Sequence, residues 1–135
     1  MKINELCIGD WVTTPMGDRG YIAALTAHDT THGMVEVVED EEGAMSKWES
    51  QQLSPIPITA KVLEKNGLVF VDIENDECYD LYANSEVMVY HNKKGKNWSC
   101  ATPTVNATVH SIHELQHTLQ LARVTLKIRL WQGKK

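Results

Sequence analysis

The sequence predicts a strand-rich α+β fold, in which a small SH3-like barrel (residues 1–56) precedes an antiparallel sheet covered by one or two short helices (residues 57–135). Three patterns predict it. Short β-rich segments alternate with turn-forming residues, one later segment has apolar residues at helical spacing, and strict apolar–polar alternation follows that segment. The length of 135 residues suits two small parts that pack together as one compact unit.

The N-terminal part should contain four short strands separated by turns. We expect them at residues 10–14, 21–26, 34–38 and 44–48. The segments between them are rich in Gly, Asp and Glu, and the first contains Pro15. Strands at this spacing are typical of a small, strongly curved barrel. Pro55 and Pro57 should then stop the sheet and form a stiff connector.

The C-terminal part begins with a short predicted helix. Thr59 can cap it, and Asn66-Gly67 supplies a left-handed stop after Lys65. Five strands should follow, at residues 68–71, 79–82 and 87–91, around Trp98, and at residues 104–109. Between them we expect an acidic turn at residues 74–80 and a basic hairpin turn at residues 92–96.

A second helix is predicted at residues 111–122, because the apolar residues Ile112, Leu115, Leu119 and Ala122 form one stripe. Ser111 and Glu114 form an S-x-x-E capping box in front of it. After the helix, apolar residues from Val124 to Leu130 alternate with polar ones, which predicts a half-buried strand.

Charge is distributed unevenly along the chain. Residues 1–57 carry ten acids and three bases, a net −7, whereas residues 90–135 carry eight bases and one acid, a net +7. The three cysteines are odd in number and widely spaced, so we expect neither a disulfide framework nor a cysteine-rich zinc site. Without an apolar run for a signal peptide or a membrane span, a cytoplasmic location with no membrane contact is expected.

Residues 113–117 match H-E-x-x-H, the string in which zinc peptidases place two imidazoles one helical turn apart. Such an enzyme needs a third protein ligand, and residues 118–135 contain no His, Asp, Glu or Cys. His110 lies upstream, but the capping box places it outside the helix and gives Glu114 a structural task. His113 and His117 should lie away from the apolar stripe, facing solvent.

We therefore interpret the string as coincidental and expect no cofactor. The alternative is a zinc-dependent hydrolase in which His113 and His117 bind the metal, Glu114 is the base and His110 is the third ligand. The loop residues His28, Asp29 and His32 are a weaker cluster that loop polarity explains equally well.

The expected binding surface is Trp98 beside the basic turn with Lys93, Lys94 and Lys96. An unidentified protein is the expected partner, and self-association is left open. Aromatic residues interleaved with bases also suit single-stranded nucleic acid, so nucleic-acid binding through the basic C-terminal half is an alternative. The overall net charge of −5 argues against it.

Three segments of the chain also resemble a family of small uncharacterised proteins encoded in prophages and mobile elements of gut bacteria. The similar segments are residues 1–12, residues 53–59 with the following helix that ends in Asn66-Gly67, and residues 109–117. The resemblance implies no assigned activity, cofactor or catalytic residue, so no functional residue is carried over. We expect a non-catalytic accessory or binding protein of a mobile element.

Overall fold

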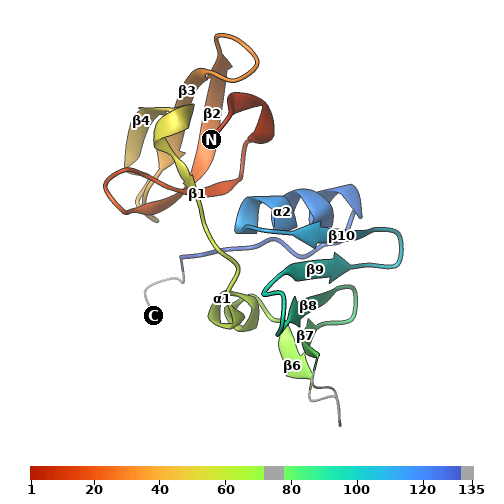
Figure 1. Cartoon of the computed structure of the whole chain (residues 1–135). Helices are drawn as coiled ribbons and strands as arrows, with labels where there is room; N and C mark the ends of the chain where they lie inside the picture. The colour runs from red at the N-terminus through yellow and green to blue at the C-terminus, as the bar shows by residue number, and fades with distance from the viewer. Residues whose placement is uncertain (72–77, 132–135) are drawn as a thin grey trace. The chain divides into compact units, whose positions relative to one another are not determined.

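The computed structural model of this chain describes residues 1–71 and 78–131. Within these residues the chain forms two five-stranded antiparallel sheets and two α-helices, which confirms the predicted α+β, strand-rich class (Figure 1). The predicted acidic turn at residues 74–80 falls largely outside the described residues. The contacts divide the chain into a first unit, Met1–Ile56 together with the segment from Arg129, and a second unit, Pro57–Ile128. The predicted second part, residues 57–135, is therefore too long at its C-terminal end.

The sheet of the first unit is a curled half-barrel with the strand order β4-β3-β2-β1-β5. Its strands are β1 (Trp11–Thr13), β2 (Arg19–Ala27), β3 (Gly33–Val38), β4 (Met45–Glu49) and β5 (Ser54–Pro55). Short 3-10 helices, η1 (Ile3–Glu5) and η2 (Ser50–Gln52), precede β1 and follow β4. Pro55 does not stop the sheet as expected, because it lies in the edge strand β5, opposite Val12, where a missing N–H is tolerated.

The curl of this sheet encloses a small apolar core. Its buried members are Ile3, Leu6, Val12, Ile22, Val35, Val37 and Leu53. A register shift between Ile22 and Ala24 bends β2. Gly20 permits the close approach of β2 and β3, because a Cβ at this position would collide with the backbone oxygen of Val38.

The segment from Arg129 adds an aromatic side chain to this unit. The Trp131 indole Nε1–H donates to the carbonyl oxygen of Arg19 at 2.9 Å. Its ring meets Trp11 edge-on, with centroids 4.8 Å apart, and Tyr21 at 5.4 Å. Edge-to-face pairs of this kind add stability beyond the area that they bury. The sequence pattern did not predict that Trp131 would pack against Trp11.

The sheet of the second unit is a simple meander with the order β10-β9-β8-β7-β6. Its strands are β6 (Val69–Val71), β7 (Tyr79–Ala83), β8 (Met88–Asn92), β9 (Trp98–Ala101) and β10 (Asn106–Val109). The helices are α1 (Ala60–Lys65) and α2 (Ile112–Leu121), close to the predicted ranges. Thr59 Oγ1 accepts from the N–H of Val62 at 3.3 Å, and Gly67 takes the predicted left-handed conformation with φ of 87°.

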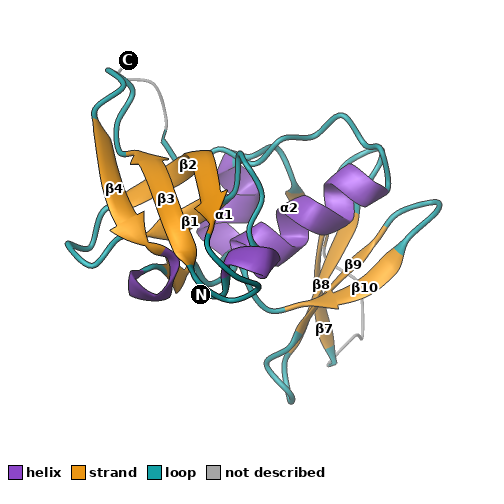
Figure 2. Cartoon of the chain, turned by 90° about the horizontal axis from the view of Figure 1, so that it is seen from above, coloured by secondary structure: helices purple, strands orange, loops and turns teal. Residues whose placement is uncertain are grey.

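Among the described residues, helices cover one face of this second sheet. The strand residues Tyr82, Val89, Cys100 and Val109 share a face by their pairing register, and all four are buried. Figure 2 shows α1 and α2 on one side of the strands, and the apolar residues of α2, with Leu63 of α1, complete this core. We call the other side of the sheet the open face.

Residues 124–130 do not form the predicted strand. None of these residues lies in a β-strand, yet Val124, Leu126, Ile128 and Leu130 are more buried than the polar residues between them. The alternation therefore predicted correctly which side chains are buried. It predicted the strand wrongly, because an alternating burial pattern does not by itself specify a β-strand. Thr125 instead fixes this segment, because its N–H and hydroxyl both donate to the Glu86 carboxylate, at 3.2 and 2.6 Å.

Replacing Trp131 by alanine should destabilise the first unit by about 2 kcal/mol, roughly half the cost of removing a fully buried Trp. The loss comes from the ring contacts with Trp11 and Tyr21 and from the bond to Arg19. Chemical denaturation followed by Trp fluorescence measures it, with the exposed Leu121→Ala as a control that should change little. Equal stabilities of the two variants would contradict docking of this segment.

The Thr125 contact should respond to pH. Hydrogen bonds from Thr125 hold the pKa of the Glu86 carboxyl below its ordinary value of 4.5. The contact is therefore stable above that pH and is lost as the pH falls through the lowered pKa. In an NMR titration the Thr125 amide proton should shift with a midpoint below 4.5, and Glu86→Gln should abolish this titration. A midpoint at or above 4.5 would contradict the assignment.

Candidate functional site

Four aromatic side chains gather at one corner of the second sheet, and we call them the aromatic corner. They are Phe70, Tyr82, His91 and Trp98, one from each of β6, β7, β8 and β9. His91 and Trp98 are register partners whose rings stack, with centroids 4.3 Å apart and planes 17° apart. Tyr82 links Trp98, at 6.1 Å, to Phe70, at 5.5 Å. The corner is a continuous aromatic surface that crosses four strands.

The rings lie on the face that carries the helices, but the helices leave part of the corner accessible. Phe70 is 45% exposed, and Trp98 and His91 are half-buried, whereas Tyr82 is buried. Burial, followed by the charges of Asp80 and Glu64, raises the pKa of the Tyr82 phenol. The phenol therefore stays neutral at physiological pH.

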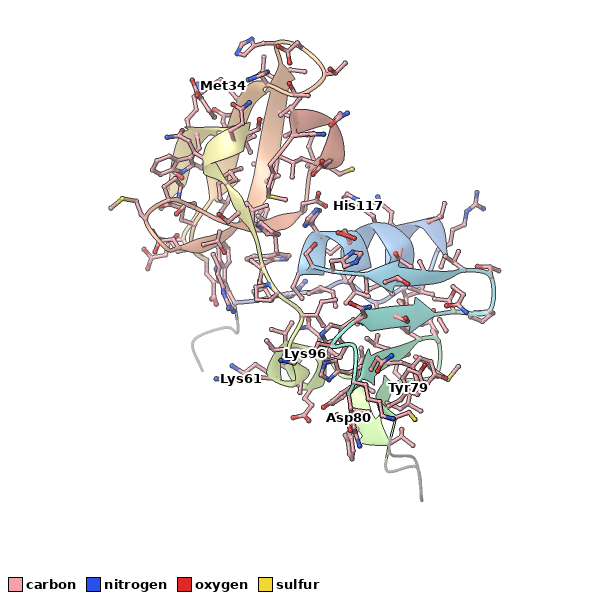
Figure 3. All side chains as sticks on the ribbon, viewed as in Figure 1. Met34, Lys61, Tyr79, Asp80, Lys96 and His117 are labelled. Carbon is pink, nitrogen blue, oxygen red and sulfur yellow. The ribbon has the colours of Figure 1, made fainter. Side chains whose placement is uncertain are left out.

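Charged groups of both signs border the aromatic corner. The Asp80 carboxylate lies 3.5 Å from Lys93 Nζ and 3.9 Å from His91 Nδ1. Figure 3 labels Asp80 and Tyr79, consecutive residues of β7 whose side chains point to opposite faces of the sheet. The corner therefore has an apolar centre and a rim that contains a partly exposed ion pair.

The basic turn is built by Asn92, whose side-chain oxygen accepts the N–H groups of Lys94 and Gly95 at 3.0 and 3.1 Å. Lys96 closes it in the left-handed region, with φ of 58°. Lys94 and Lys96 are exposed (Figure 3 labels Lys96). The structure places Lys93 Nζ 3.5 Å from Asp80, whose carboxylate also approaches His91, the stacking partner of Trp98. The sequence did not single out the other members of this corner and its rim, which are Asp80, His91, Tyr82 and Phe70. Sequence reasoning missed these four because strand register, which it could not fix, places them there.

The H-E-x-x-H residues lie on α2, as predicted, but the prediction that both imidazoles face water is wrong for His113. His113 is only 5% exposed, and its Nδ1 lies 2.8 Å from the Ser111 hydroxyl. Helix α2 is buried over a wider arc than its apolar stripe, because Thr118 is also buried. A buried imidazole is tolerated when its polar atoms have partners, and Ser111 supplies one of them.

His117 is half-buried, and its ring meets that of His113 edge-on with centroids 5.7 Å apart. Glu114 does not bond back to the Ser111 amide as the capping box predicted. Its Oε1 lies 3.1 Å from Nδ1 of His110, which precedes the helix, whereas Ser111 Oγ does accept the Glu114 N–H at 3.5 Å. Within the second unit, His110, His113, Glu114 and His117 do not bring three ligand atoms close enough to share one ion.

The loop cluster of the first unit has a structural explanation. The Asp29 carboxylate accepts the N–H groups of Thr31 and His32, both at 2.8 Å, and His32 Nδ1 lies 3.0 Å from it. These bonds hold the pKa of Asp29 well below its usual range. The carboxylate therefore closes its own loop, as in an Asx turn.

Two cysteines are poorly suited to nucleophilic chemistry. Burial raises the pKa of the Cys100 thiol to about 11, so that it is protonated at neutral pH. The pKa of Cys7 is also raised, by burial and then by the nearby charge of Asp10. No disulfide joins the three cysteines, all of which are described residues.

Comparison with protein-family models, with curated proteins and with solved structures finds no match to this chain. In the described part of the chain, no helix is both long and apolar enough to cross a membrane.

The double role of Ser111 can be measured against Thr59, which caps α1 in the same way. Thr59→Ala should cost about 1 kcal/mol, the usual cost of losing an N-cap. Ser111→Ala should cost about 2 kcal/mol, since it also deprives the buried His113 of a partner. Urea denaturation of the two variants provides the comparison. Equal losses would mean that Ser111 acts only as a cap.

Proposed function

We propose that this chain is a non-catalytic binding protein whose second unit holds a protein partner through the aromatic corner. The observation that carries the proposal is the set of touching rings from four strands, partly exposed and centred on the stacked pair of His91 and Trp98. Aromatic side chains, Trp and Tyr above all, dominate the binding energy of protein interfaces when they lie at the centre with polar groups around them.

The mixed charge of the rim favours a protein over nucleic acid. The Asp80 carboxylate lies within 4 Å of Lys93 and His91, so an anion on the rim offsets the charge of the nearest lysine. A phosphate backbone gains affinity from cations and would be repelled by this carboxylate. A protein surface can offer both a donor for Asp80 and an acceptor for Lys93.

The geometry of α2 gives less support to the zinc-dependent hydrolase. Its base, Glu114, is paired with His110, and His113 is buried with Nδ1 beside Ser111. A catalytic zinc site needs three converging ligands and an open position for water.

The biological setting belongs to the proposal as well. The resemblance of the three sequence segments supports a protein encoded by a prophage or mobile element. A cytoplasmic location is consistent with the absence of disulfides among the three cysteines.

Peptide selection tests the proposed surface directly. Ligands would be selected from a random phage-displayed peptide library on the immobilised chain, and their affinities measured by fluorescence anisotropy. Trp98→Ala should weaken the selected peptides by about thirtyfold, the effect of a hot-spot residue. Lys93→Ala should weaken them by a smaller factor, since it removes one rim charge and no ring.

Two control variants separate binding from folding. Lys61→Ala removes an exposed lysine of α1, and Tyr79→Ala changes the opposite face of β7, so both should bind like the unmodified chain. Circular dichroism checks that every variant is folded. Peptide binding that survives Trp98→Ala would contradict the proposal. A single-stranded oligonucleotide that binds with a steep salt dependence, and is lost in Trp98→Ala, would establish the nucleic-acid alternative instead.

A further inference from the structure

The described strand residues that face the open side of the second sheet include no charged residue. Strand alternation and the pairing register assign to it two or more residues from each of the five strands. They are Val69, Val71, Tyr79, Leu81, Ala83, Met88, Tyr90, Asn92, Ser99, Ala101, Asn106 and Thr108. Charged residues make up 23% of the chain, so their complete absence here is a marked departure.

Large apolar groups of this face are in contact with solvent. Val69 is 65% exposed, Tyr79 43%, Met88 40% and Val71 39%. Leu81, in the middle, is 8% exposed because its register partners Val71 and Tyr90 flank it on both sides. A sheet face turned to water normally carries polar and charged side chains. A face made of apolar residues with Tyr and Met, and without charges, is typical of the core of a protein interface.

We propose that this open face binds the open face of a second copy of the chain, so that two sheets stack into a symmetric dimer. In a twofold interface every residue near the axis meets its own copy, and any charge there would meet the same charge. A face without Asp, Glu, Lys or Arg avoids that repulsion, although each chain carries a net charge of −5. This face has no charge that could attract a different partner by electrostatic complementarity.

The size of the face is sufficient for such a dimer. Five strands about 4.8 Å apart, each with about four residues at ~3.3 Å per residue, give a footprint of roughly 20 by 15 Å. Accessible surface exceeds this planar footprint because side chains project from the sheet. Covering the face on both copies therefore buries roughly 1,000 Å² of accessible surface, which is at the lower limit for a specific interface. An interface of this size is typical of weak association, so we expect a reversible dimer that depends on concentration.

Sedimentation velocity on the full chain, between about 5 and 200 µM at physiological salt, tests the dimer directly. The unmodified chain should pass from monomer to dimer across this range. Met88→Lys places a charge on β8, the central strand of the open face, and should weaken the dimer at least about tenfold. Met45→Lys, the matched control, changes an exposed strand methionine of the first unit and should leave the dimer unchanged.

Two results would overturn the inference. One is a chain that stays monomeric at the highest concentration, and the other is a dimer that Met88→Lys and Met45→Lys affect equally. A monomeric chain that floats with uncharged phosphatidylcholine vesicles, and loses this in Met88→Lys, would assign the face to lipid. Trp98→Ala should leave the dimer intact, so failure of the dimer and failure of the aromatic corner as a binding surface are separately visible.

Discussion

One-sided cover of the second sheet is the constraint on which the properties of this unit depend. A β-sheet exposes two faces, and successive residues of each strand serve them alternately. The helices α1 and α2 supply apolar cover for one face, where Val89, Cys100 and Val109 are buried. The other face must meet solvent or another molecule. No further described helix or strand of this unit covers it. The residue types on the open face therefore indicate whether that face is suited to solvent or to another molecule.

That composition separates two chemistries on the two faces. Asp80 and His91 lie on the face that carries the helices, at the aromatic corner that the helices leave partly exposed. There Asp80 approaches Lys93, and His91 stacks on Trp98. Tyr79 and Tyr90, each one residue away, point to the open face and touch each other. Placing every charge of these strands on one face is a matter of register, since a shift by one residue would exchange the two sets. The register therefore determines the surface chemistry as well as the core.

Much of this architecture was predictable from local patterns. Both helices begin at their predicted caps, because Thr59 and Ser111 each accept a backbone N–H, a signal contained in three or four residues. Strands β1 to β4 also follow the predicted segments, because β-rich runs bounded by turn residues are local signals, whereas β5 at Pro55 was not predicted. What failed depends on contacts between distant residues. Alternation around Leu126 predicted inward side chains correctly and a strand wrongly, since a ladder needs a partner that local sequence does not specify.

The candidate site was predictable only in part. Trp98 and the lysine turn adjoin in sequence, so their proximity needed no fold. Asp80, which supplies the negative charge of the rim, and Tyr82, which links Trp98 to Phe70, come from β7, which is distant from this turn in the sequence. The prediction for His113 was wrong in its exposure. Its motif suggested metal binding, and its position away from the apolar stripe suggested a side chain that faces solvent. The structure instead buries it beside Ser111, because a side-chain hydroxyl two residues away satisfies its Nδ1.

The two proposed surfaces also have a joint consequence. Since the aromatic corner and the open face lie on opposite sides of one sheet, stacking two open faces leaves both corners uncovered. A dimer of this kind presents two copies of Trp98 to a partner. Bivalent display raises the effective affinity for a partner with repeated epitopes without any new contact, provided that both sites can be reached at once. A weak, reversible dimer can then be enough, because each interface needs to supply only part of the total affinity.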